Sequence, residues 1–165
     1  MTRLIIANLL TCVATIISLS SSFFKTKKQM LTVQSTECVI NGATRIIVNS
    51  LSSSSQLFLC AIRNIVFAKF SNKYLYFLFA GLFLIIGLIA NNQGILGLFP
   101  VFATIQYTLW TGFSKTAKQI RIGMIINYIP WIIHDLVIGL YVSAIVMVIS
   151  AIIVIYNLIK NDPNS

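Results

Sequence analysis

Four polar side chains recur along one otherwise apolar stretch of the chain, at steps of three, four and four residues: Gln34, Glu37, Asn41 and Arg45. On a helix this spacing places all four on one face and leaves the opposite face apolar. Amide, carboxylate and guanidinium groups can hold a small polar molecule through hydrogen bonds. The spacing therefore predicts a polar face that meets either a solute or a neighbouring helix.

A second, very similar polar stripe lies 90 residues further on and consists of Asn127, Trp131, His134 and Asp135. At this offset Glu37 matches Asn127, Asn41 matches Trp131 and Arg45 matches Asp135. We expect the two stripes to converge around a central cavity. Arg63 and Asn64, from another apolar stretch, would contribute near the middle of the membrane.

Two interpretations of these residues stay open. In the first they line a cavity and bind a solute, and the binding residues are Gln34, Glu37, Asn41, Arg63, Asn64, Asn127 and Trp131. In the second they only tie helices together, because polar contacts between helices are common in membranes. A charge at membrane depth costs about 2.5–3.5 kcal/mol on insertion scales, which favours the functional interpretation.

Arg45 and Asp135 have opposite charges and occupy equivalent positions near the outer ends of their stretches. We expect them to face each other as an outer gate, although Arg45 could instead extend to the lipid headgroups. His134 could couple transport to protons, because histidine titrates near neutral pH. Adjacent helical residues point about 100° apart, so we do not expect His134 to pair with Asp135.

The composition places the chain in a membrane. Hydrophobic residues make up 58% of its 165 residues and charged residues only 9%, against about 25% charged residues in soluble domains. We predict an all-α integral membrane protein with one transmembrane domain, residues 1–165. Positive charge follows the first apolar stretch, so we expect a membrane helix there and not a secretory signal.

Seven apolar stretches are long enough to cross a bilayer as helices: 4–24, 30–50, 53–70, 74–90, 95–113, 120–138 and 140–159. The third stretch starts within the serines at 52–55, which we expect to lie in a short loop as a turn and a helix cap. Nine of the twelve Lys and Arg residues follow the first, third, fifth and seventh stretches. The positive-inside rule then predicts an outside N-terminus and an inside C-terminus. Six spans would result if the turn at Gly139 is misread.

A five-residue motif supports two related halves: Lys-Thr-x-Lys-Gln occurs at 25–29 and again at 115–119. Placing the copies in register aligns residues 4–70 with residues 95–159 as parallel three-helix repeats, with a linker helix at 74–90. This 3+1+3 arrangement resembles the SWEET sugar transporters, the PQ-loop proteins and the PnuC-type vitamin transporters, and the parallel repeat is the known arrangement of SWEETs. The Pro-Gln pair of PQ-loop proteins is absent from this chain.

The chain also resembles the YgjV family of small bacterial inner-membrane proteins. The resemblance rests on Lys-Lys-Gln at 27–29, Ala-Ile-Arg-Asn at 61–64 and Asn-Tyr at 127–128, and it extends over about residues 24–160. It implies a multi-pass protein of the bacterial inner (plasma) membrane, but it implies no particular activity.

Several functional classes lack their sequence signatures. The net charge of +9 lies in short clusters without an extended basic face, so we expect no nucleic-acid partner. No nucleophile–base motif, P-loop or metal-binding pattern occurs, so we expect no enzyme activity, no cofactor and no metal.

We predict a transporter that moves a small polar solute, uncharged or zwitterionic, by alternating access between the repeats. The alternative is a small membrane accessory protein that binds a partner and moves nothing. A homo-oligomer is compatible with either.

Overall fold

The computed structural model describes residues 2–21, 23–70 and 72–161, and these residues form seven α-helices and one short 3-10 helix without any strand. The elements are α1 (Thr2–Ser21), α2 (Lys27–Ile47), α3 (Leu51–Lys69), α4 (Lys73–Ile89), η1 (Gly94–Gly97), α5 (Leu98–Phe113), α6 (Ala117–Val137) and α7 (Tyr141–Asn161). The prediction of an all-α membrane protein with seven helices is confirmed. The chain reverses between α6 and α7 at Gly139, where φ is +79°, so this turn separates two helices.

Five of the described segments are long and apolar enough to cross a membrane: Arg3–Ser21, Leu51–Lys69, Gly94–Phe113, Ala117–Val137 and Tyr141–Lys160. Helix α4 is apolar but has only 17 residues. Helix α2 has 21 residues, but its polar stripe lowers its hydropathy. Because the polar side chains Gln34, Ser35, Thr44 and Arg45 are buried, α2 does not expose them to lipid.

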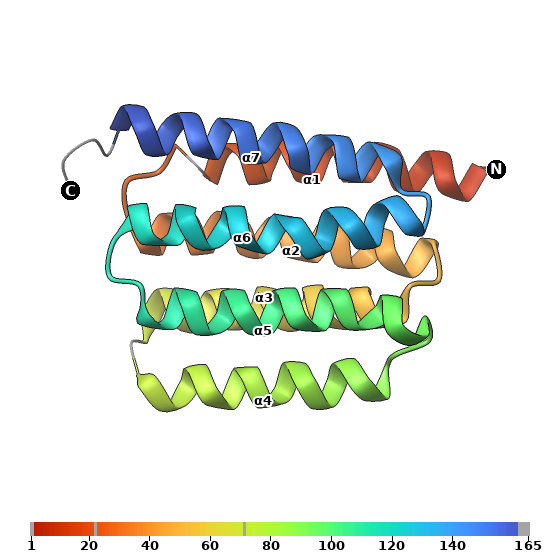
Figure 1. The fold of residues 1–165 in the computed structure, drawn as a ribbon, viewed down its shortest axis with the longest axis horizontal. Helices are drawn as coiled ribbons and strands as arrows, with labels where there is room; N and C mark the ends of the chain where they lie inside the picture. The colour runs from red at the N-terminus through yellow and green to blue at the C-terminus, as the bar shows by residue number, and fades with distance from the viewer. Residues whose placement is uncertain (1, 22, 71, 162–165) are drawn as a thin grey trace.

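Consecutive helices run up and down (Figure 1). Helices α1, α2 and α3 form one layer, α5, α6 and α7 form the other, and α4 lies at one side. Helix α2 packs between α1 and α3, and α6 packs between α5 and α7. The two layers meet where α1 contacts α7 and where α3 contacts α5, while α4 packs on α5 and α3. Helices α2 and α6 therefore lie in the middle of the bundle, which is where the two predicted polar stripes are.

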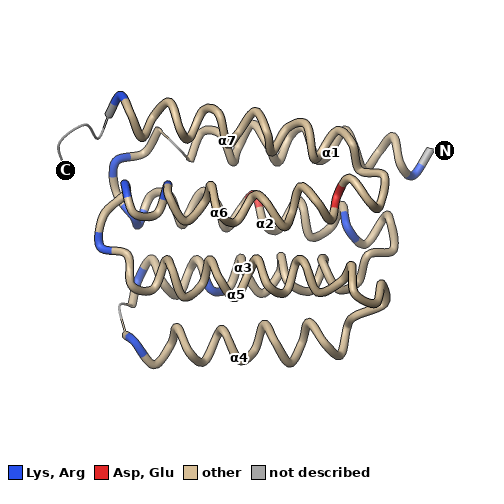
Figure 2. The backbone as a smooth tube through the Cα atoms, viewed as in Figure 1, with Lys and Arg blue, Asp and Glu red and all other residues tan. Residues whose placement is uncertain are grey.

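Most of the basic residues gather at one end of the bundle (Figure 2). This end carries the connections after α1, α3 and α5 and the end of α7. Arg3 is at the start of α1 and Arg45 is near the end of α2, so both belong to the opposite end. The positive-inside rule predicts that the basic end faces the cytoplasm. The inside C-terminus and outside N-terminus stay predictions of this rule.

The repeated Lys-Thr-x-Lys-Gln motif has a local physical role, because each copy starts a helix. Thr26 and Thr116 are the N-caps of α2 and α6, and each hydroxyl accepts a hydrogen bond from the backbone N–H of the glutamine three residues later, at 3.3 Å. The Gln119 side chain also accepts from the backbone N–H of Thr116, which completes a capping box. The motif therefore positions the two helices that carry the polar stripes.

The prediction that the serines at 52–55 form a loop is wrong, because α3 begins at Leu51. The chain reverses earlier, at Asn49, whose φ of +58° lies in the left-handed region that asparagine tolerates. Small hydroxyls then bind carbonyls of neighbouring segments. Ser54 donates to the Gly42 carbonyl and Ser52 to the Gly97 carbonyl, both at 2.9 Å.

Candidate functional site

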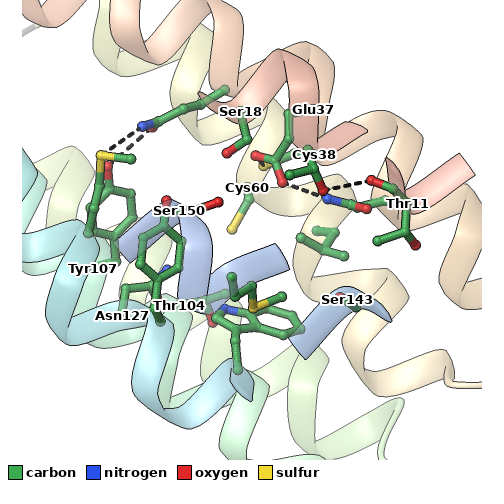
Figure 3. A pocket seen from close by; sticks show the side chains of 18 of the residues that line it. Thr11, Ser18, Glu37, Cys38, Cys60, Thr104, Tyr107, Asn127, Ser143 and Ser150 are labelled. Carbon is green, nitrogen blue, oxygen red and sulfur yellow. Dashed lines mark hydrogen bonds between the residues drawn. The ribbon is translucent and has the colours of Figure 1, made fainter. Parts of the chain in front are cut away.

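A cavity of about 100 Å³ lies inside the bundle, between α2 and α6 (Figure 3). Its lining includes all seven residues that the sequence predicts for a binding site: Gln34, Glu37, Asn41, Arg63, Asn64, Asn127 and Trp131. Arg45 also lines it, whereas His134 and Asp135 are not among the lining residues. The helical spacing of the two stripes thus brings the expected groups together at one place.

Several lining residues are absent from the sequence prediction. Helix α1 contributes Thr11, Thr15 and Ser18, helix α7 contributes Ser143 and Ser150, and helix α5 contributes Thr104 and Tyr107. Thr11, Thr15 and Ser18 follow one another at steps of four and three, so the helical spacing could have revealed this face of α1. Hydroxyl groups predict a binding site less strongly than charges do, because a hydroxyl in a helix can donate to a backbone carbonyl of the preceding turn. Thr11 does so, donating to the Ala7 carbonyl at 2.9 Å.

Arg45 and Asp135 form a buried ion pair that joins α2 to α6. Two guanidinium N–H groups meet the two carboxylate oxygens, and the Nη2–Oδ2 distance is 2.7 Å. Ser143 on α7 donates a further hydrogen bond to Oδ2. The Arg45 guanidinium lies 5.4 Å from the centre of the Trp131 ring. Both charges are therefore compensated within the bundle, and Arg45 does not extend to the lipid headgroups.

The expectation that His134 does not pair with Asp135 is wrong. Nδ1 of His134 lies 3.1 Å from Oδ1 of Asp135, and Nε2 lies 3.0 Å from Oε1 of Gln93 in the connection after α4. The angle of about 100° between neighbouring residues separates the Cα–Cβ bonds, but rotation about χ1 and χ2 returns the imidazole to the carboxylate. His134 is fully buried and ties this connection to the ion pair.

Arg63 on α3 is almost completely buried and has a different kind of environment. Its Nε and Nη2 donate to Oδ1 of Asn64 at 3.1 and 2.6 Å, and Nη1 donates to the Thr108 hydroxyl on α5 at 2.8 Å. The guanidinium also lies 5.1 Å from the centre of the Tyr107 ring. In the part of the chain that the structure describes, no carboxylate forms an ion pair with Arg63.

Glu37 on α2 accepts a hydrogen bond from Nδ2 of Asn41 at 2.6 Å, and the Cys38 thiol lies 3.9 Å from its other oxygen. Among residues 2–21, 23–70 and 72–161, Glu37 has no cationic partner at ion-pair distance. Asn127, the residue that matches it on α6, has a buried side-chain oxygen without a hydrogen-bond partner in the described residues. The cavity wall thus offers two acceptors from the two central helices.

Comparison with known proteins shows which family the chain matches. The model of the family Imp-YgjV, bacterial inner membrane protein, matches residues 5–164. No curated protein and no solved structure shows a significant match to the chain. The match bears out a multi-pass protein of the bacterial inner membrane, while the resemblance to SWEET, PQ-loop and PnuC-type transporters stays a prediction.

Proposed function

We propose that this chain, which belongs to the Imp-YgjV family of bacterial inner membrane proteins, moves a small polar solute across the membrane by alternating access. The observation that carries the proposal is the buried cavity, whose wall holds Glu37, Asn41, Arg63 and Asn127. Charged and amide groups around an internal space are costly in a membrane and are typical of solute pathways. Because the cavity has about 100 Å³, the bound solute is small.

Contacts between residues 90 positions apart support the 3+1+3 arrangement on which alternating access would rest. Arg45 pairs with Asp135, and Nε2 of Gln34 donates to the sulfur of Met124 at 3.4 Å. A twofold axis that runs along the bundle between α2 and α6 would bring equivalent residues together in this way. It would also pair α1 with α7 and α3 with α5, as the helix contacts do.

The basic end of the bundle follows the same symmetry. Lys27 Nζ donates to the carbonyl of Ser114 at 3.1 Å, and Arg121 Nη2 donates to the carbonyl of Phe24, the residue that matches Ser114, at 3.3 Å. Each half therefore binds the end of the other half's first helix. The two repeats therefore contact each other at both ends of α2 and α6. In this proposal one repeat rotates against the other about the cavity between them.

The Arg45–Asp135 pair would be the outer gate, since Arg45 is the last lining residue on α2 towards the end opposite the basic connections. In this proposal the pair separates when the site opens outward. His134 contacts Asp135 but does not line the cavity, so proton coupling through His134 would act on the gate and not on the solute.

Reversing the gate charges tests this proposal. Arg45→Asp or Asp135→Arg alone places two like charges in one buried contact, and each should reduce solute uptake into proteoliposomes at least tenfold. The double variant restores an opposite pair and should recover a measurable part of the uptake. Gel filtration identifies which variants are folded. A folded double variant without any recovery would refute the gate.

The proposed function itself is tested with purified protein in detergent. Its thermal stability is screened against sugars, nucleosides, polar vitamins and amino acids, and a ligand at 100 times its Kd should stabilise by about 2.7 kcal/mol. We expect a hit that Glu37→Gln or Asn41→Ala abolishes. Thr36→Ala, a change at an exposed residue next to Glu37, should leave the hit unchanged. Uptake of the same ligand into proteoliposomes then tests transport.

One observation favours the second candidate function, a membrane accessory protein that moves nothing. Much of the buried polar surface is already used between helices, as in the bond of 2.6 Å from the Thr104 hydroxyl on α5 to the Gln56 side chain on α3. Such bonds hold a static bundle together. Absence of any hit across the ligand panel, together with a tightly bound partner protein after mild solubilisation, would favour this function over transport.

A further inference from the structure

The charges around the cavity divide into a compensated pair and two charges without an ionic partner. Asp135 compensates Arg45. This leaves Glu37 and Arg63, one of each sign, and both line the same cavity. Within the described residues neither has an oppositely charged partner at ion-pair distance. Since each charge is costly at this depth, an arrangement with two separate uncompensated charges calls for a ligand that compensates both.

The Arg63 side of the cavity presents hydrogen-bond donors. The guanidinium has five N–H groups, and its bonds to Asn64 and Thr108 use three of them. One N–H group on each terminal nitrogen remains, and a carboxylate has enough acceptor sites for both. The rings of Tyr107 and Phe83 lie 5.1 and 5.7 Å from the guanidinium and hold its plane in place.

The Glu37 side presents acceptors. The Glu37 carboxylate has accepting capacity beyond its bond to Asn41. The side-chain oxygen of Asn127 is buried and has no hydrogen-bond partner among the described residues, although buried polar atoms in proteins nearly always have one. A carboxylate and an unsatisfied carbonyl oxygen from the two central helices form a site for an ammonium group.

We infer that the solute is a small zwitterion, whose ammonium binds Glu37 and Asn127 and whose carboxylate binds Arg63. This inference rests on the proposed function and specifies its substrate class. An uncharged solute would leave both protein charges uncompensated, and a simple anion or cation would leave one. The volume also limits the solute, because a cavity of about 100 Å³ is smaller than the roughly 150 Å³ that accommodates benzene.

The first experiment measures the thermal stability of the purified protein with glycine, β-alanine and 4-aminobutyrate, in which the distance between the two charges increases. Each zwitterion has two matched analogues of nearly equal size. The hydroxy acid lacks the ammonium, and the amide lacks the carboxylate. We expect at least one zwitterion to raise Tm, and we expect both of its analogues to bind at least tenfold more weakly.

Two variants then assign each end of the ligand. Glu37→Gln should weaken binding of the zwitterion at least tenfold but leave the weak binding of the hydroxy acid unchanged, because that analogue has no ammonium. Arg63→Gln should weaken the zwitterion and leave the amide unchanged. Asn127→Ala is a second variant of the ammonium end, and it should behave as Glu37→Gln does if that variant does not fold. If Arg63→Gln does not fold, the comparison of the zwitterion with its amide on the original protein tests the carboxylate end. Lys69→Gln, which removes an exposed charge outside the cavity, is the control.

The outcomes distinguish failure of the zwitterion inference from failure of the proposed transport function. If a sugar or another uncharged solute binds and is transported while no zwitterion does, the inference is wrong and the transport proposal stands. If a zwitterion binds but both analogues bind equally well, the assignment of the two charges is wrong. If no ligand of any class binds or is taken up, the inference and the proposed function both fail.

Discussion

Replacing Asp135 with alanine should destabilise the folded protein by about 3–5 kcal/mol, because it leaves the Arg45 guanidinium buried without its counter-charge. Both side chains are almost fully buried, so bulk water does not screen the charge that remains. The measurement is thermal or chemical denaturation of the purified protein in detergent.

Two controls separate the ion pair from general damage to α6. Ser143→Ala removes only the hydroxyl that donates to Asp135, and it should cost about 1 kcal/mol. The double variant Arg45→Met with Asp135→Leu replaces both charges by apolar groups and should recover most of the lost stability, since well-packed apolar pairs often equal buried ion pairs. A stability for Asp135→Ala within about 1 kcal/mol of the original protein would contradict a buried pair.

Replacing Gly112 with alanine should destabilise the protein by about 1–3 kcal/mol through overpacking. A Cβ atom at this position of α5 would collide with the Tyr76 ring on α4. That ring is held in turn by Phe67, whose centroid is 4.8 Å away in an edge-to-face contact. Because the collision involves a buried, rigid ring, neither partner can move without disturbing the contact between α4 and α5.

Gly81 on α4 is the matched control. A Cβ there meets nothing within 4 Å, so Gly81→Ala should stabilise by up to about 1 kcal/mol through helix propensity alone. The two variants make the same chemical change on helices that pack together. Equal melting temperatures for both would mean that α4 does not pack against α5 at Gly112.

The sequence by itself predicts the helices and the two polar stripes, because both are local properties. Apolar length and the scarcity of charge require membrane helices, and steps of three and four residues decide which side chains share a face. For this reason Glu37, Asn41 and Asn127 could be placed on one cavity without a structure. The offset of 90 residues between the two Lys-Thr-x-Lys-Gln motifs also predicted the contact of Arg45 with Asp135.

The tertiary structure decided which groups are already satisfied, because a hydrogen bond depends on the distance between atoms from different segments. The helical spacing predicted that His134 and Asp135 would not pair. Rotation of the side chains nevertheless brings Nδ1 of His134 to 3.1 Å from Oδ1 of Asp135. The serines at 52–55 are typical of a loop, yet they lie inside α3, where the hydroxyls of Ser52 and Ser54 donate to carbonyls of neighbouring segments. Only the packed bundle shows that Asp135 compensates Arg45 and leaves Glu37 and Arg63 facing one cavity, since compensation of charge is a property of neighbours in space.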